Sequence, residues 1–195
     1  MNCNCKLSLI LFLFLILINS VSADNNKNIP FRVGIIVPLS GPVAEYGIAF
    51  RNGIQFAVED NQKGVNNVEF IFEDSEYDAK KAVSAFQKLR NQNKIDLAYS
   101  FGGPPSGALA PLADQYKTPL FVTPPDSTMS EGRNYVIRFE NPENDFGEQL
   151  SAYLDKSGFS KLAVIKTENP YINCMLRGLS NSLKSGQSIS VIESF

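Results

Sequence analysis

The sequence predicts an α/β fold, in which a Rossmann-like parallel sheet carries helices on both faces and the start of a second α/β lobe follows. Three observations predict it. Continuous apolar runs rich in Val and Ile, such as 31–39, are typical of central parallel strands covered on both faces. These runs alternate with segments of helical spacing, which indicates βαβ units with right-handed crossovers. The alternation resumes near Asn141, which predicts the second lobe.

The chain up to Val122 is expected to contain four strands and three helices, in strict alternation. The strands are expected over 31–39, 68–72, 95–99 and 119–122. Apolar residues at helical spacing predict helices over 44–62, 78–90 and 106–116. Asp78 and Ser106 are expected to cap the second and third of these helices.

The pattern changes after Thr123. A short strand over 135–139 has no helix before it, and a helix, a strand, a helix and a strand then follow. They are expected over 142–157, 161–165, 171–184 and 189–192. The predicted organisation is therefore a first lobe over 24–140 and a partial second lobe over 141–195.

Residues 1–23 have the pattern of a signal peptide. Leu7–Ile18 is almost unbroken apolar sequence, and Val21-Ser22-Ala23 supplies the small residues that a signal peptidase reads. The alternative is a membrane anchor, but a spanning helix needs about 20 apolar residues. Cleavage near Ala23, a periplasmic location and no stable membrane anchor after cleavage are therefore expected.

Composition excludes several function classes. The chain has no histidine, so Ser-His-Asp and Cys-His catalysis cannot be built in their usual form. Removing residues 1–23 leaves Cys174 as the single cysteine, which with no histidine cannot complete a zinc site. It also leaves 17 of the 18 basic residues against 20 acidic ones, a net charge of −3. Neither nucleic acid, a metal nor a cofactor is expected.

Three loops at strand ends form the candidate binding surface, because ligands of open α/β sheets lie at the carboxyl ends of strands. In the first loop, Ser40 offers a hydroxyl and Tyr46 an aromatic face with a polar tip. The alternative is an ordinary strand-to-helix turn. The second loop, 101–107, leads into a helix, where Ser106 and free N–H groups could hold a carboxylate or a phosphate. It lacks the Lys-Ser/Thr ending of a phosphate-binding P-loop, and no dinucleotide-binding glycine pattern follows any strand.

The third loop, 123–128, offers groups suited to a zwitterion. The carbonyl of Pro125 can accept from an ammonium group, Ser127 can serve either pole, and Asp126 either pairs with a cation or faces solvent. Two other features have mainly structural interpretations. The acidic stretch 73–78 could bind calcium, but it fits better as a favourable partner of the next helix dipole. Cys174 lies in a helical pattern, where a buried thiol is expected.

Four of these segments together resemble a known family. They are Val33–Gly47 with its Leu39-Ser40-Gly41-Pro42 turn, the acidic stretch Glu73–Ala79, Thr123-Pro124 and Asn169-Pro170-Tyr171. In this order and spacing they look like the type I periplasmic solute-binding proteins of ABC importers, in particular the branched-chain amino acid (Leu/Ile/Val)-binding group. The resemblance covers the chain from Pro30 onward.

The resemblance implies two lobes that close on an amino acid like a hinged clamp. It implies that Ser106 meets the carboxylate, Pro125 and Ser127 meet the ammonium group, and Tyr46 and Tyr171 line and close the pocket. This sequence differs from the family pattern in Gly103-Pro104-Pro105, in Pro125-Asp126 and at Ile172. Family members are substantially longer, so a C-terminally truncated member is expected.

The functional hypothesis is a periplasmic substrate-binding component of an ABC importer, which captures an amino acid of the branched-chain type or a similar small polar solute. Its partners would be that ligand and the subunits of an ABC permease, and no reaction is expected. One alternative is a non-transport sensor or a truncated remnant of the same fold. The other is an exported Rossmann-like enzyme, whose general base would be Asp126, Glu45 or Asp74.

Overall fold

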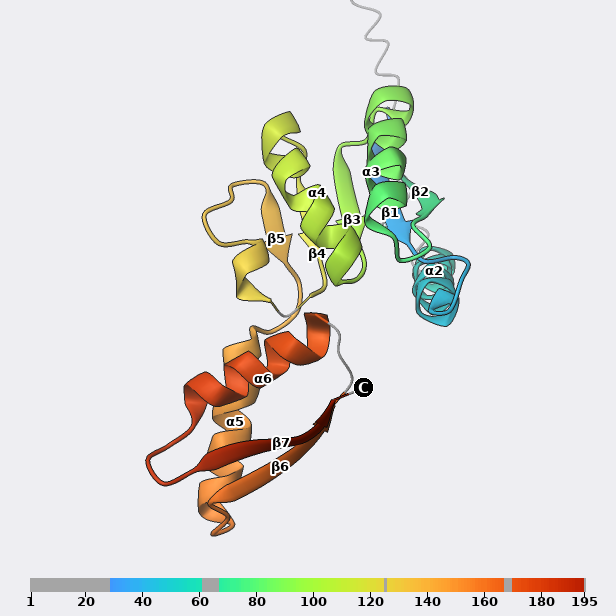
Figure 1. The fold of residues 1–195 in the computed structure, drawn as a ribbon. Coiled ribbons are helices and arrows are strands. Elements are labelled where there is room, and N and C mark those ends of the chain that lie inside the picture. Colours follow the sequence, from blue (N-terminus) through green and yellow to red (C-terminus); the bar gives the residue numbers. More distant parts are fainter. Residues whose placement is uncertain (1–28, 61–66, 125, 167–169, 195) are drawn as a thin grey trace, which may run out of the picture.

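The chain forms two parallel sheets in the computed structural model, which describes residues 29–60, 67–124, 126–166 and 170–194 (Figure 1). The first sheet has five strands in the order β2-β1-β3-β4-β5, and every neighbouring pair is parallel. The strands are β1 (Phe31–Val37), β2 (Val68–Asp74), β3 (Leu97–Ser100), β4 (Leu120–Val122) and β5 (Val136–Arg138). The strand order reverses between β1 and β3, and this point of an open sheet is where ligands bind.

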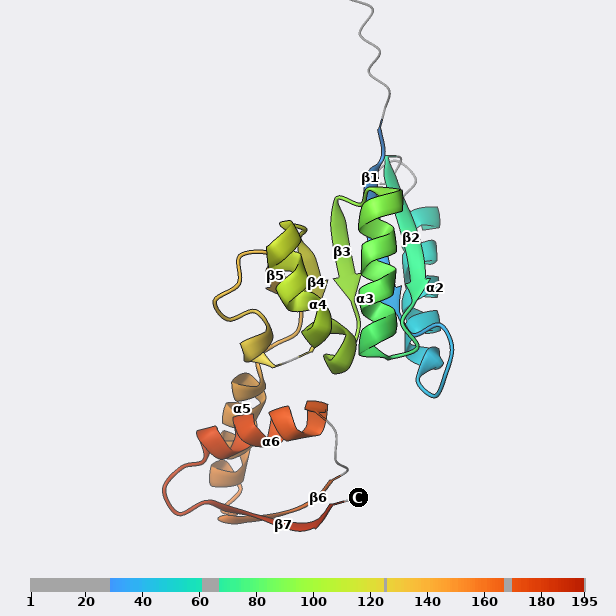
Figure 2. The same cartoon turned by 45° about the horizontal axis from the view of Figure 1, so that its top comes forward.

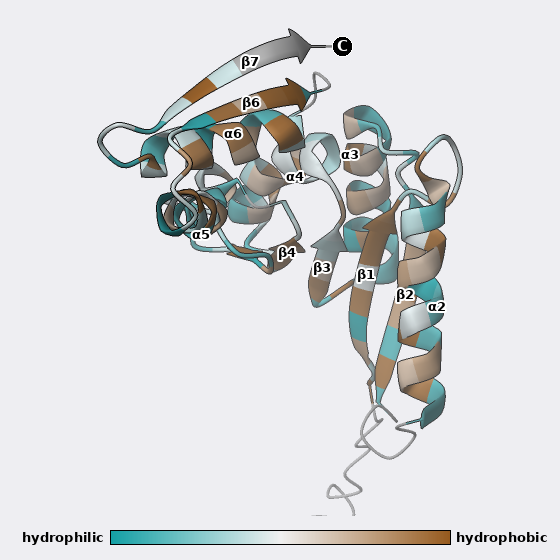
Figure 3. Cartoon of the chain, turned by 90° about the horizontal axis from the view of Figure 1, so that it is seen from below, coloured by the Kyte–Doolittle hydropathy of each residue, from teal (hydrophilic) through white to brown (hydrophobic). Residues whose placement is uncertain are grey.

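Helices cover both faces of this sheet. On one face, α3 (Ala79–Lys88) and α4 (Gly103–Tyr116) pack over Ile36, Ala98 and Leu120. On the other face, α2 (Ala44–Asp60) places Phe50 and Ile54 against Val33, Ile35 and Val37. Neighbouring residues of β1 therefore point to opposite faces, and its continuous apolar run follows from burial on both sides. Figure 2 shows α3 and α2 on opposite sides of the strands, and Figure 3 shows β1 largely hydrophobic while α2 carries both colours.

Asp78 caps α3 as the sequence predicts, because its carboxylate accepts the backbone N–H of Lys81 at 2.8 Å. The helix then runs into a π-helical turn, η1 (Leu89–Asn93), which ends at Lys94 in the left-handed conformation. The buried face expected for this helix is confirmed, since Ala82, Phe86 and Leu89 are fully buried.

The start predicted for α4 is wrong. The helix begins at Gly103 with Gly102 as its N-cap, three residues before the expected start, so Ser106 lies inside its first turn and caps nothing. The physical reason is the pair Pro104-Pro105. The fixed φ of proline suits the first helical turn, and N–H groups in that turn have no helical acceptor, so their absence does not weaken the helix there.

The second unit pairs two helices with a two-stranded parallel sheet. It comprises α5 (Glu143–Lys156), β6 (Lys161–Lys166), α6 (Pro170–Ser182) and β7 (Ser188–Ser194). The two helices cross where Gly147 faces Gly178, and a Cβ added at either glycine would collide with the backbone of the other helix. Glycine is thus required at this crossing because the two backbones touch.

The predicted α/β fold class is confirmed, with a parallel sheet covered on both faces and a second α/β series after it. The predicted boundary at 140–141 falls in the connection between β5 and α5, and the division into two domains stays a prediction. The proposed signal peptide, 1–23, lies outside the described residues. None of the helices that the structure describes is both long and apolar enough to cross a membrane.

Candidate functional site

A cavity of about 590 Å³ lies at the carboxyl edge of the five-stranded sheet, between that sheet and α6. Segments that follow all five strands contribute to its wall, and the N-terminal turn of α6 closes the other side. The lining residues are Val43, Tyr46, Tyr77, Phe101, Gly102, Gly103, Thr123, Pro124, Asp126, Met129, Glu140, Pro170, Tyr171 and Cys174. The cavity therefore draws on both units of the chain, and its size is that of a small-molecule site.

Aromatic side chains form much of the wall. The Tyr46 ring stacks on Phe101 with centroids 5.8 Å apart, and Tyr77 tilts against Phe101 at 6.4 Å. Tyr171 contributes a fourth ring from α6, and both Tyr46 and Tyr171 are about half exposed, at 54% and 46%. These faces can pack against an apolar body and can attract a cation through their π electrons.

The β3–α4 junction brings backbone close to the cavity. Gly102 has φ +88°, and a Cβ there would collide with the Tyr77 ring, so only glycine fits between that ring and α4. The Gly102 N–H donates to the Thr123 hydroxyl at 3.4 Å. Pro104 and Pro105 have no N–H to offer, and the Ser106 N–H donates to the Gly102 carbonyl at 3.1 Å. Among the first four helical residues, only Gly103 retains an N–H that no described group occupies.

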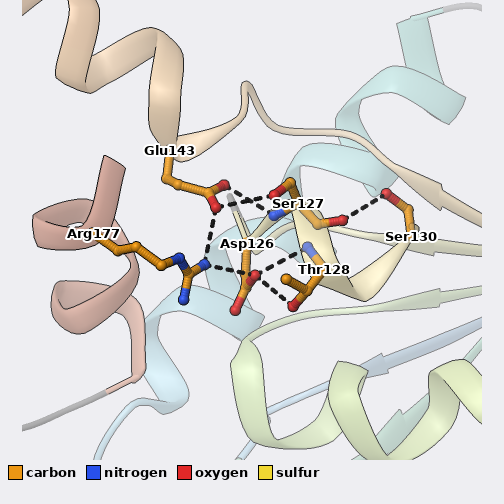
Figure 4. A network of polar contacts seen from close by, with 6 residues as sticks. All are labelled: Asp126, Ser127, Thr128, Ser130, Glu143 and Arg177. Carbon is orange, nitrogen blue, oxygen red and sulfur yellow. Dashed lines mark hydrogen bonds and ion pairs between the residues drawn. The ribbon is translucent and has the colours of Figure 1, made fainter. Parts of the chain in front are cut away.

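An ion network joins the two units beside the cavity (Figure 4). The Arg177 guanidinium, from α6, donates to Glu143 Oε1 and to Asp126 Oδ1, both at 2.9 Å. Glu143, at the start of α5, also accepts the backbone N–H of Ser127 at 2.9 Å and its hydroxyl at 3.0 Å. The network holds the β4–β5 connection against α5 and α6, so it fixes one wall of the cavity.

Glu143 is buried, with 2% of its surface exposed, yet it stays ionised. Burial alone would raise its pKa, but the hydrogen bonds from Arg177 and Ser127 outweigh that effect and lower the pKa to about 2. Asp126 and Cys174 lie beside it, and one ligand atom from each of the three falls within 4.8 Å of the others. The Arg177 guanidinium already donates to both carboxylates and supplies the positive charge of this cluster.

Two carboxylates face the cavity itself. Asp126 uses Oδ1 to accept from Arg177 and from the backbone and hydroxyl of Thr128, while no described residue donates to its Oδ2. Desolvation raises the pKa of Glu140, and the nearby charge of Arg138 opposes that rise. Burial likewise raises the pKa of Tyr171, and the negative charge of Glu140 adds to it. No basic residue occurs among the described residues that line the cavity.

Of the site residues predicted from the sequence, some line this cavity and others do not. Tyr46 and Tyr171 both line it, from opposite sides. Ser127 lies beside the cavity, but its hydroxyl donates to Glu143. Ser40 donates its hydroxyl to Asp74 at 2.6 Å and does not line the cavity. Pro125 lies outside the described residues.

Ser106 does not reach the cavity. It is fully buried, and its hydroxyl is directed to the carbonyl and hydroxyl oxygens of Ser100 at 3.3 and 3.1 Å. The early start of α4 explains this, because it moves Ser106 from the helix end to the underside of the first turn. The expected contact between Ser106 and a carboxylate therefore has no geometric support, and this hydroxyl instead ties α4 to β3.

Sequence reasoning missed five residues that form or support the site. Phe101 and Tyr77 were not singled out, although both lie in segments that follow strands and thus in the region where a site was expected. The pairing of Glu143 with Arg177 spans 34 residues, and no local spacing signals it. Glu140 was also missed, and its position just after β5 is the one signal that could have pointed to it.

Comparisons with known proteins show the family of the chain. A family model described as "Periplasmic binding protein" matches residues 30–193. The chain is 28% identical over 168 residues to the Leu/Ile/Val-binding protein of Escherichia coli, an alignment that covers 80% of this chain and 45% of that protein. The Leu/Ile/Val-binding protein of Rhizobium johnstonii is 28% identical over 171 residues, which cover 82% of this chain and 46% of that protein. The chain thus spans about half the length of the curated relatives it matches.

Solved structures agree on the fold. A solute-binding protein of an ABC transporter from Rhodopseudomonas palustris, in complex with 3,4-dihydroxybenzoic acid, superposes with a TM-score of 0.73 at 22% identity. That match covers 85% of this chain and 47% of the other. A leucine-binding protein from Thermotoga maritima superposes with a TM-score of 0.71 at 21% identity, over 83% of this chain and 48% of the other.

Proposed function

We propose a solute-binding role from one premise: the chain belongs to the periplasmic binding protein family. In this role it captures a small organic solute outside the cytoplasm and delivers it to the permease of an ABC importer. The curated relatives are solute-binding proteins rather than enzymes, which favours capture without a reaction.

The observation that carries the proposal is the cavity at the carboxyl edge of the first sheet. It lies where strand order reverses, which is the general ligand position of open α/β sheets. Its lining comes from both units, with Tyr46 on one side and Tyr171 on the other. A ligand between these two rings would contact both units at once, as closure of two lobes on a solute requires.

For the ligand we propose an amino acid of the branched-chain type or a solute of similar size. The names of the curated relatives support this class, and the aromatic wall suits an aliphatic side chain. Asp126 Oδ2 and Glu140 provide acceptors for an ammonium group. One structural neighbour was solved in complex with 3,4-dihydroxybenzoic acid, so a binding test should compare amino acids with aromatic acids.

Isothermal titration of the intact chain with leucine, isoleucine, valine and 4-hydroxybenzoate tests the proposal. We expect saturable binding of at least one amino acid, with one ligand per chain. Tyr171→Ala should weaken that binding about tenfold, because it removes one aromatic wall. Tyr153→Ala is the matched control, since Tyr153 is exposed on α5 and does not line the cavity. Absence of binding by every solute, or equal effects of the two variants, would overturn the proposal.

A further inference from the structure

We propose that the cavity selects its solute by a cationic pole: it takes an ammonium group, primary or quaternary, attached to an apolar body, and it does not require a carboxylate. This inference rests on the proposed solute-binding function and narrows its ligand class. Three features of the cavity carry it.

The first feature is the scarcity, at the start of α4, of N–H groups that could bind an anion. Backbone N–H groups of a first helical turn are the usual means of holding a carboxylate. Here Pro104 and Pro105 remove two of them, and the third N–H, that of Ser106, is bonded to Gly102. The Ser106 hydroxyl is also committed, to Ser100 beneath the helix. A carboxylate at this helix end would find the Gly103 N–H and little else.

Two further prolines extend this shortage around the cavity. Pro124 follows β4 and Pro170 is the first residue of α6, and both line the cavity without an N–H. The guanidinium that could have met a carboxylate, that of Arg177, is bound to Asp126 and Glu143 instead. Among the described lining, a carboxylate would therefore meet neutral hydroxyl and N–H donors but no cation to offset its lost hydration.

The second feature is the sign of the local charge. Glu140 and Asp126 are the charged residues among the described lining, and both are acidic. Glu143 adds a third carboxylate beside them, and the nearby guanidinium groups are those of Arg177 and Arg138, so the local balance is one net negative charge. Burial is the largest cause of the rise in the pKa of Cys174 to about 11, and the carboxylates of Glu143 and Asp126 raise it more than Arg177 and Arg138 lower it.

The third feature is the aromatic wall. Tyr46, Phe101 and Tyr77 form a connected series of ring contacts on the sheet side, and Tyr171 lies on the α6 side. Electron-rich ring faces around a space attract organic cations, and quaternary ammonium ligands are the familiar case. The same rings pack against the methylene groups of an aliphatic amine. The wall therefore favours the cation and its apolar body together.

Three solutes with one shared isobutyl body test the inference on the intact chain. They are leucine, 3-methylbutylamine, which lacks the carboxylate, and 4-methylpentanoate, which lacks the amine. We expect the amine to bind at least as tightly as leucine and the acid to bind at least about thirtyfold more weakly than the amine. The phenyl series of phenylalanine, 2-phenylethylamine and 3-phenylpropanoate repeats the test with an aromatic body.

The outcomes separate the two proposals. If leucine binds and the amine does not, or if the acid binds as tightly as leucine, solute capture stands and the selection by charge is overturned. If no solute of either series binds, both proposals fail.

Two variants make the test residue-specific. Glu140→Gln should weaken the amine about tenfold and leave the acid unchanged, whereas Glu131→Gln, at an exposed position outside the lining, should change neither. Pro104→Ala restores an N–H at the second position of α4 and should strengthen binding of the acid without affecting the amine. Equal responses of amine and acid to these changes would contradict the inference, and the melting temperature of each variant confirms that it is folded.

Discussion

The two units of this chain are held together by different means. The first packs a five-stranded sheet between helices through hydrophobic clusters on its two faces, the larger of which includes Ile36, Phe86 and Leu109. The second has a two-stranded sheet, and its helices meet backbone to backbone at Gly147 and Gly178. Hydrophobic burial therefore stabilises the first unit, whereas close helix contact and the Glu143–Arg177 pair are prominent in the second. One wall of the cavity therefore rests on a large hydrophobic core, whereas the other depends on a backbone contact and an ion pair.

The largest effect is expected from the core of the first unit. Phe86 is fully buried on α3, so Phe86→Ala should lower the free energy of unfolding by about 3–5 kcal/mol. Urea denaturation followed by circular dichroism measures this loss. Phe56→Ala, at an exposed position on α2, is the control and should cost less than about 0.5 kcal/mol. Similar losses for Phe86→Ala and Phe56→Ala would show that burial in the core does not account for the stability of the first unit.

A shift of the pH dependence of stability is expected from the ion network. The folded-state pKa of Glu143, about 2, lies below its ordinary value of 4.5. Its contribution is therefore fully present above pH 4.5 and is lost as the pH falls toward 2. This contribution amounts to at most about 3 kcal/mol, because solvent screens the exposed end of Arg177.

Urea denaturation between pH 2 and pH 6 measures this contribution, and Glu143→Gln should flatten the curve in that window. Glu148→Gln, at an exposed position of the same helix, should keep the wild-type profile. A Glu143→Gln profile that still falls as steeply as that of the wild type would show that other carboxylates govern acid unfolding.

The helix crossing of the second unit should tolerate no side chain. A Cβ at Gly178 would collide with the backbone carbonyl of Glu143, so Gly178→Ala should destabilise the chain by about 1–3 kcal/mol. Gly53→Ala is the matched control, since nothing lies within 4 Å of a Cβ there. Because alanine favours a helix over glycine, that control should gain up to about 1 kcal/mol in a thermal or urea melt. If both variants gained stability, the close crossing would be refuted.

The smallest effect is expected at Ser40. Its hydroxyl donates to Asp74, whose pKa is lowered because the hydrogen bonds from Ser40, Glu76 and Leu39 together outweigh desolvation. Ser40→Ala removes one partly exposed hydrogen bond and should cost about 0.5–1 kcal/mol of stability. Solute affinity should not change, since Ser40 does not line the cavity. A loss of affinity with unchanged stability would place Ser40 at the ligand instead.

The sequence predicts the first unit well because its signals are local. The apolar run of β1, the cap at Asp78 and the alternation of strands and helices each reflect short-range chemistry. The start of α4 was missed because serine is a frequent cap, while the competing signal, two prolines just before it, also fits a first helical turn. Local patterns allow both positions, the proline pair favours the earlier one, and the Ser106 hydroxyl then bonds to Ser100.

The site is harder to predict because it is assembled from distant segments. The strand-end rule brought Tyr46 into consideration and the family resemblance brought Tyr171, and both line the cavity. That rule gives no information on which polar groups form hydrogen bonds within the protein and are therefore unavailable to a ligand. The hydroxyls of Ser40, Ser106 and Ser127 each have a partner in Asp74, Ser100 or Glu143. Those pairings depend on the tertiary register of the sheet and α5.

Hydrogen–deuterium exchange of the intact chain, with and without saturating leucine, tests most directly whether one solute bridges the two units. We expect slower exchange in two segments at once, the β3–α4 junction at 99–103 and the first turns of α6 at 171–177, because a solute between Tyr46 and Tyr171 contacts both sides. Unchanged surface segments such as 155–160, at and after the end of α5, serve as the internal reference. Slowed exchange on only one side, or on neither while calorimetry registers binding, would contradict it.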